Sequence, residues 1–162
     1  MDQLSHVDTD GKARMVDVGD KSETVREARA RGAIVMQPTT LALIQRNAVQ
    51  KGDVLAVAKI AGIMAAKRTA ELIPLCHPLP LTTVDLTFQF NMQEAQIDIE
   101  SMARVTGKTG VEMEALTAVA AAALTVYDMC KAVDRDMRIT DIRLIEKHGG
   151  RSGSYRRSGE VL

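Results

Sequence analysis

Aromatic residues are nearly absent from this chain of 162 residues, which has no tryptophan, two tyrosines and two phenylalanines. Proteins that bind single-stranded nucleic acid, or RNA through a stacking sheet, need aromatic platforms, so this scarcity argues against both classes. Hydrophobic residues nevertheless make up 46% of the chain. We therefore expect one globular domain with a core of leucine, isoleucine, valine, alanine and methionine.

An excess of charge of one sign is also lacking. The chain has 21 basic and 21 acidic residues and a sequence pI of about 6.8. No overall field therefore attracts nucleic acid or an anionic membrane. The most apolar run, Val54–Met64, contains Lys59 and ends before Lys67, which makes it too short for a membrane-spanning helix. We expect no nucleic acid and no membrane among the partners.

Cysteine is limited to Cys76 and Cys130. Because nothing in the sequence indicates secretion, we expect two reduced thiols rather than a disulfide. Residues 1–19 contain no apolar segment of the kind that forms the core of a signal peptide. These observations together predict a cytoplasmic protein.

Periodicity and turn residues predict an α+β domain. Alternating apolar side chains over Thr83–Phe90 and Ala95–Val105 predict a hairpin with its turn at residues 91–94. Prolines at positions 74, 78 and 80 exclude a helix just before this hairpin. The expected helices are Glu23–Arg31, Pro38–Arg46, Val54–Leu72 and Glu112–Val133, and the other expected strands are Ala33–Met36 and Ile139–Ile145.

This order of elements favours a ferredoxin-like antiparallel sheet with helices packed on one face. We expect residues 15–154 to form this single domain. Residues 1–14 are polar, and residues 155–162 belong to a basic tail rich in glycine and serine. Both terminal segments are therefore expected to be flexible.

The expected helix Glu112–Val133 carries chemically useful groups at both ends. Glu112 and Asp128 are sixteen residues apart. In one straight helix this separation is about 24 Å along the axis and about 160° around it. Such a helix cannot bring both ends to one small ligand. Either the two ends serve different sites, or a second copy of the chain completes each site.

The glutamates at the start of this helix have structural as well as functional interpretations. Thr109 and Glu112 have the spacing of a capping box, and for Glu112 catalysis is an equally good interpretation. Glu114 is either an ordinary exposed helix residue or part of a site. The preceding TGKTG is not a Walker A loop, because Met102 stands where that motif needs its first glycine. Backbone amides and Lys108 at the helix start can still bind an anion.

The other end of the helix carries an acid and a base. Asp128 and Lys131 lie three residues apart and so share one helix face. They form either a surface ion pair or a buried acid–base pair, and the apolar stretch 120–126 beside them favours burial. Lys51 precedes a Gly-Asp turn, from which its amine can extend into a cleft.

His77 lies in the proline-rich segment. It is either a loop residue that packs for structure or a group that binds substrate or transfers a proton. No residues at metal-ligand spacing accompany it, so no metal site is predicted. Basic residues also follow several predicted elements, among them Lys108, Lys147 and Arg151. They are interpreted mostly as solvated surface, because they would have to cluster in the fold to bind a polyphosphate.

Several sequence motifs, which together extend over nearly the whole chain, form a highly specific combination. The most specific pair is LCHPL with TGKTGVEMEAL. The segments are MVDVG at Met15–Gly19, ETVREARA at Glu23–Ala30, KGDV at Lys51–Val54, AGIMAAKRTAELIPLCHPL at Ala61–Leu79, TGKTGVEMEALTA at Thr106–Ala118, LTVYDMCKAVD at Leu124–Asp134 and GGRSG at Gly149–Gly153. In these segments the chain resembles the molybdenum cofactor biosynthesis protein C (MoaC) family.

The resemblance implies a lyase, a cyclic pyranopterin monophosphate synthase. Its substrate would be 3′,8-cyclo-7,8-dihydroguanosine 5′-triphosphate, and its products would be cyclic pyranopterin monophosphate and diphosphate. The resemblance also implies ferredoxin-like dimers that assemble into hexamers as a trimer of dimers, with each active site at a dimer interface. No organic cofactor is required, and Mg²⁺ can accompany the triphosphate.

The resemblance further assigns roles to single positions of this sequence, none of which departs in type from the family pattern. The catalytic residues would be Asp128, Lys131 and Lys51, and the substrate-binding residues would be Asp17, Arg26, Leu75, Cys76, His77, Glu112, Met113 and Glu114. The alternative is a non-catalytic oligomer that senses a nucleotide. A sensor would not need a cluster of acid, base and histidine, and an assay of diphosphate release separates the two hypotheses.

Overall fold

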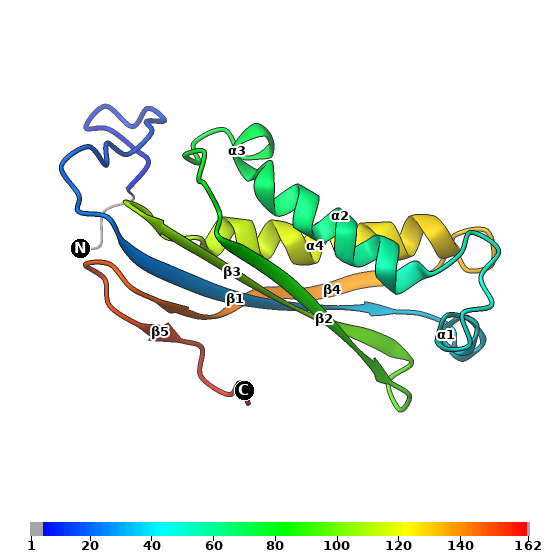
Figure 1. Cartoon of the computed structure of the whole chain (residues 1–162). Helices are drawn as coiled ribbons and strands as arrows, with labels where there is room; N and C mark the ends of the chain where they lie inside the picture. Colours follow the sequence, from blue (N-terminus) through cyan, green and yellow to red (C-terminus); the bar gives the residue numbers. More distant parts are fainter. Residues whose placement is uncertain (1–4, 162) are drawn as a thin grey trace.

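The structure, a computed structural model, describes residues 5–161. Five antiparallel strands form one open sheet in the order β2-β3-β1-β4-β5, and the helices lie on one of its faces (Figure 1). The expected α+β class with helices on one face is therefore confirmed. The elements are β1 Thr24–Val35, α1 Pro38–Gln45, α2 Val54–Lys67, α3 Thr69–Leu72, β2 Thr83–Asn91, β3 Gln96–Gly107, α4 Glu112–Cys130, β4 Arg138–His148 and β5 Tyr155–Arg156.

The topology is that of a split βαβ sheet. Strand β1 lies between β3 and β4, and both neighbours run antiparallel to it. Helices α2 and α4 supply the two crossovers, which gives the β-α-β-β-α-β order of a ferredoxin-like fold. Both α2 and α4 pack over the sheet, side by side (Figure 1).

Strand β1 replaces the helix expected over Glu23–Arg31, so that prediction was wrong. Alanine, arginine and glutamate all favour helices, which hid a period of two in the sequence. Ala28 and Ala30 are fully buried under the helices, whereas Arg29 and Arg31 lie on the open face. Pairing with two neighbouring strands decides the conformation here, over the local propensity.

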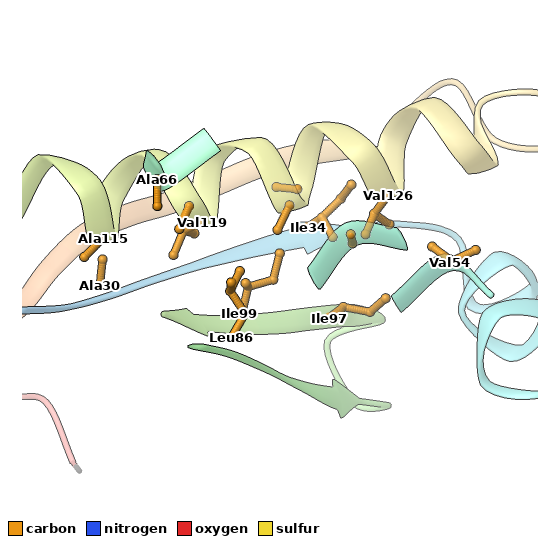
Figure 2. Packing of buried hydrophobic residues seen from close by; sticks show 14 of the residues in the cluster. Ala30, Ile34, Val54, Ala66, Leu86, Ile97, Ile99, Ala115, Val119 and Val126 are labelled. Carbon is orange, nitrogen blue, oxygen red and sulfur yellow. The ribbon is translucent and has the colours of Figure 1, made fainter. Parts of the chain in front are cut away.

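Helix α4 lies close to the middle of the sheet because the facing residues are small. Figure 2 shows Ala115 of α4 facing Ala30 of β1, with Val119 about one turn further along the helix, and all three are fully buried. A Cβ at Gly32 of β1 would lie 2.7 Å from the Val119 side chain, so glycine permits this approach. Close packing of this kind holds α4 as one straight element across the sheet.

Helix α2 begins as expected and ends earlier than expected. The Asp53 side chain caps its start by accepting a hydrogen bond from the Ala56 amide at 3.0 Å. The single helix expected over Val54–Leu72 is divided at Arg68, whose φ of −112° leaves the helical region. The hairpin of β2 and β3 and helix α4 occupy the expected places, although α4 ends at Cys130 rather than Val133.

The terminal segments make contacts of their own. Val7 pairs with Ala13 in an isolated bridge, and Tyr155 and Arg156 form β5 beside β4. The Glu160 carboxylate pairs with two arginines on the open face of the sheet. The flexibility of residues 1–14 and 155–162 stays a prediction, and residues 1–4 and 162 lie outside the described part.

Within residues 5–161, α4 is the one helix long and apolar enough to cross a membrane, judged by length and composition only. Half of its most apolar window is buried inside the fold, and the core helix of a globular domain passes the same test.

Candidate functional site

A cleft of about 740 Å³ opens at the N-terminal end of α4. Its walls come from the segment before β1, the start of β1, the proline-rich segment after α3, the β3–α4 loop with the first turn of α4, and the end of β4 with the loop after it. These segments are far apart in the sequence, and the fold brings them together. Residues expected from the sequence that line the cleft are Arg26, Leu75, Cys76, His77, Glu112, Met113 and Glu114.

Glu114 is the buried acid of this cleft, with 4% of its surface exposed. Burial, together with the charge of the nearby Glu112, raises the pKa of Glu114 to about 7. Burial and then the charge of Glu114 also raise the pKa of the Cys76 thiol. A carboxyl group that titrates near neutral pH can donate or accept a proton there. The sequence allowed two interpretations of Glu114, and its burial excludes the one as an ordinary exposed helix residue.

Glu112 forms an ion pair across the cleft rather than a helix cap. Its carboxylate accepts from Lys147 Nζ at 2.8 Å. The expected capping box is not formed, because Val111 is the N-cap residue and no side chain caps the helix. The Thr109 hydroxyl donates instead to the carbonyl of Gly110. Lys147 comes from β4, so this contact was not visible as a local pattern.

Arg26 places a buried cation beside the cleft. The residue is 9% exposed, and one guanidinium nitrogen donates to the Lys108 carbonyl at 3.4 Å. Its buried Nε has no hydrogen-bond partner among the described residues. Gly149 and Gly150 have φ values of 96° and 80°, and a Cβ at Gly150 would lie 1.8 Å from Arg26 Nη1. The glycine pair thus leaves the space that the guanidinium fills.

Further basic residues line the same cleft, and their clustering was not predicted. They include Lys108, Lys147, His148 and Arg151, from the β3–α4 loop, β4 and the loop after β4, and the segment before β1 adds His6 and Lys21. In the sequence these basic residues stand near the ends of predicted elements. This position is the only sequence signal that could have indicated their clustering. Together with Arg26 they surround the N-terminal end of α4, where backbone amides and the helix dipole also favour an anion.

Lys51, Asp128 and Lys131 form a second cluster, which we call the basic–acidic trio. Lys131 Nζ lies 2.6 Å from Asp128 Oδ1, and Lys51 Nζ lies 3.4 Å from Asp128 Oδ2. Lys51 also donates to the Asp128 carbonyl at 2.9 Å. First the hydrogen bond from Lys131, and then Lys51, lower the pKa of the Asp128 carboxyl.

The trio is exposed, which corrects the burial expected for Asp128 and Lys131. Their side chains are 60% and 53% exposed. The apolar stretch 120–126 does contain buried residues, but those face the sheet, and Leu124 on the same stretch is 60% exposed. The outward face of the helix therefore carries Asp128 into solvent.

The trio and the cleft lie at opposite ends of α4. None of the three trio residues lines the cleft. Helix α4 is continuous from Glu112 to Cys130, so the separation expected between its ends, about 24 Å, applies. Within one chain the structure therefore brings together seven of the expected substrate-binding residues and, separately, the three expected catalytic residues.

Asp17 is not brought into either cluster. Its neighbours Val16 and Val18 line the cleft, whereas Asp17 is exposed. Its carboxylate accepts a hydrogen bond from the Gly19 amide at 2.8 Å. In an extended segment, alternate residues point to opposite sides, which explains why the neighbours of Asp17 face the cleft and Asp17 does not.

Over residues 5–161, no group of three or more histidine, cysteine, aspartate or glutamate side chains is placed to hold a metal ion. Both cysteines are free thiols, Cys76 half-buried and Cys130 buried. The groups available for chemistry are therefore carboxylates, amines, guanidinium groups, imidazoles and one accessible thiol.

Comparisons with known proteins agree on one family. The MoaC family model matches residues 15–150. A protein of Chloroflexus aggregans named cyclic pyranopterin monophosphate synthase is 63% identical over 157 residues, which are 97% of this chain and 95% of that protein. Proteins of the same name from Thermomicrobium roseum and Heliobacterium modesticaldum are 61% and 60% identical, over 99% and 96% of this chain and 96% and 98% of their own lengths. The chain belongs to the MoaC family.

Proposed function

We propose that this chain is a cyclic pyranopterin monophosphate synthase, a lyase of molybdenum cofactor biosynthesis. Its relatives carry this name at 55–63% identity over nearly their whole length. The substrate would be 3′,8-cyclo-7,8-dihydroguanosine 5′-triphosphate, and the products cyclic pyranopterin monophosphate and diphosphate. The observation that carries the proposal is the cleft at the start of α4, where a buried carboxyl of raised pKa lies among clustered cations.

The cations of the cleft suit the phosphate half of the reaction. Closing a cyclic phosphate requires an oxygen of the sugar-derived part to attack the first phosphorus while diphosphate leaves. Negative charge grows on the phosphate oxygens as this bond breaks, and fixed positive groups lower the energy of that state. Arg26, Lys108, Lys147 and Arg151 surround the place where an anion would meet the helix start.

The acids and bases suit the other half, in which the five-membered ring of the purine-derived part opens and a pterin forms. These steps need protons moved between nitrogen, oxygen and carbon atoms. Glu114 has the pKa for a proton donor or acceptor near neutral pH. The trio supplies the other proton-transfer candidates, Asp128, Lys51 and Lys131, whose side chains contact one another.

Both halves require one pocket, and we infer that a second copy of the chain provides it. The Asp128 end of one α4 would meet the Glu112–Glu114 cleft of the partner, since one straight helix holds these ends about 24 Å apart. The outer faces of α2 and α4 expose Val57, Ile60, Met64 and Leu124 at 43–60%. Exposed apolar side chains on two neighbouring helices favour a protein interface. A trimer of such dimers is the complete assembly that we expect.

The chemistry of the reaction and the state of the thiols indicate the cofactor, the metal ion and the compartment. No step is an oxidation or a reduction, so no organic cofactor is needed. Mg²⁺ would enter with the triphosphate as part of the substrate, because phosphate oxygens are ligands that it prefers. Two free thiols fit a reducing compartment, so we place the protein in the cytoplasm.

An assay of purified protein with the cyclic triphosphate tests the proposal. We expect stoichiometric release of diphosphate and a pterin that becomes fluorescent on oxidation. Saturable binding of the triphosphate without diphosphate release would contradict the enzyme and support a nucleotide sensor. Addition of EDTA measures the contribution of Mg²⁺ in the same assay.

A further inference from the structure

The trio is assembled from two segments that its own contacts do not hold together. Lys51 lies in the loop between α1 and α2, whereas Asp128 and Lys131 lie at the end of α4. The side chains of Lys51 and Asp128 are 48% and 60% exposed. An exposed ion pair contributes little to the placement of a loop, because water screens the charges and long side chains lose freedom. Buried contacts must supply the order: Leu41 and Ile44 of α1 pack into the core, and a polar contact joins the two segments as well.

Asp134, just beyond α4, makes such a contact. It is 2% exposed, and its Oδ2 accepts from the Gln37 amide at 2.8 Å and from the Thr40 hydroxyl at 3.1 Å. The Gln37 side chain makes no capping bond to α1. Asp134 therefore caps the start of α1 from a distant part of the chain, and it satisfies the Thr40 hydroxyl, which is 2% exposed and would otherwise be buried without a partner.

Short connections link Asp134 to the helix end with Asp128 on one side and, through α1, to Lys51 on the other. On one side, the Asp134 amide donates to the Cys130 carbonyl at 3.1 Å, and its other carboxylate oxygen accepts from the Asp136 amide at 3.2 Å. Asp134 is thus fixed to the helix end that carries Asp128. On the other side, α1 leads through tight turns to Lys51, and Figure 1 shows α1 at the same end of the molecule as the end of α4.

We propose that Asp134 is a positioning residue, which holds α1 and the following loop against the end of α4 and so places the Lys51 amine beside Asp128. Asp134 acts through Lys51 and does not touch the substrate. The proposal rests on the role of the trio in the proposed function. Its readout, the pKa of the Asp128 carboxyl, needs no turnover. A failure of the positioning role is therefore distinguishable from a failure of the proposed function.

The experiment compares the pKa of the Asp128 carboxyl, measured by ¹³C NMR titration, in four folded variants. Lys51→Met defines the full rise in this pKa that follows from the loss of Lys51. Asp134→Asn should reproduce at least half of that rise, because the loop carries Lys51 away. The double variant should show no rise beyond that of Lys51→Met. Ser101→Ala, which removes an equally buried hydroxyl contact to the Ala115 carbonyl, should leave the pKa unchanged.

The direction of the shift separates positioning from a direct charge effect. Removing the negative charge of Asp134 would by itself lower the pKa of Asp128, since one like charge fewer faces the carboxylate. A rise therefore requires the displacement of Lys51. For the enzyme, we expect kcat to fall at least tenfold in Asp134→Asn with a change in KM of less than threefold, whereas Ser101→Ala lowers only Tm.

An Asp128 pKa that stays at its wild-type value, or falls, in folded Asp134→Asn would overturn the proposal. If this variant does not fold, Thr40→Val takes its place, because it removes one bond to Asp134 and keeps the carboxylate. A rise in the Asp128 pKa of Thr40→Val that is abolished in the Lys51→Met background supports positioning, and an unchanged value overturns it.

Discussion

The two ends of α4 hold acid and base groups in opposite surroundings. At the N-terminal end Glu114 is 4% exposed, and burial raises its pKa to about 7. At the C-terminal end the Asp128 side chain is 60% exposed, and Lys131 and Lys51 lower its pKa. The same residue class is thus neutral or charged near pH 7 according to what surrounds it.

The difference shows which end of α4 forms a complete site within one chain. The cleft has walls from several distant segments and excludes much of the solvent around Glu114, so its electrostatics are set before a ligand arrives. The trio faces water, where charges are screened and a proton-transfer group has no fixed substrate position. On our account, the partner's cleft supplies the missing cover. The variants below alter one end of α4 or the helix surface between the two ends.

The largest effect is expected at the exposed end. Asp128→Ala should lower kcat by about 10²–10⁴-fold, the usual contribution of a group that assists proton transfer. Asp85→Ala is the matched control, because Asp85 forms an equally exposed pair with Lys59 at 2.7 Å outside both clusters. Steady-state diphosphate release measures both. Wild-type turnover of Asp128→Ala would remove the trio from the mechanism.

The next effect concerns the surface between the two ends. Leu124→Asp should weaken association between chains by about 10²-fold, because an interface would have to bury the new charge. Met92→Asp, at the β2–β3 turn and 55% exposed, introduces the same charge away from the helices. Light scattering over a dilution series gives the mass of each variant. Equal association of the two variants would move the interface away from α4.

A smaller effect is expected from the loop over Arg26. Gly150→Ala should raise KM about tenfold, because its Cβ displaces the guanidinium and a hydrogen bond between charged groups contributes about 1.5–3 kcal/mol. Gly153→Ala has similar backbone strain, with φ of 65°, but its Cβ would meet no atom within 4 Å. Substrate titrations of both variants check this. A similar rise in KM for both would assign the effect to backbone strain rather than to Arg26.

The last prediction concerns stability rather than activity. Glu114 should make the free energy of unfolding depend on pH. Its pKa is about 7 in the folded chain and 4.5 for an ordinary glutamate in the unfolded chain, so between these values the folded state holds a proton that the unfolded state has released. The free energy of unfolding should therefore fall as pH rises from about 4.5 to about 7 and then level off.

Glu114→Gln should remove this fall and be more stable than wild type at pH 8 by roughly 1–3 kcal/mol, with no difference at pH 4.5. Urea unfolding at several pH values measures it. Exposed Glu71→Gln is the control and should follow wild type. The same pH slope in Glu114→Gln and wild type would show that Glu114 is not the buried acid described above.

The sequence predicted the elements whose local signals agree with the fold. The expected start of a helix at Val54 and the alternation in β2 and β3 are such signals, and the structure confirms them. The strand expected over Ala33–Met36 is the last part of β1. The first part of β1 was missed because alanine at its buried positions has no strand preference, and the approach of α4 over Gly32 explains the small residues.

The candidate site was predictable only in part, for the same physical reason. The residues of the cleft were named through the resemblance, but their surroundings depend on tertiary contacts. The pair of Glu112 with Lys147 joins residues 35 apart in sequence, and it replaced the expected cap. The burial expected for Asp128 failed because an apolar stretch does not say which helix face meets the sheet.

Mixing two inactive variants tests most directly whether the opposite ends of α4 from two chains form one site. Lys131→Ala damages the exposed end and Glu114→Ala the cleft, and each should be inactive alone. Co-expressed in equal amounts with different tags, they should recover about a quarter of wild-type activity, because half of the dimers are mixed and each mixed dimer has one intact site. Mixed dimers that co-purify but remain inactive would show that each site is built within one chain, and would contradict the account.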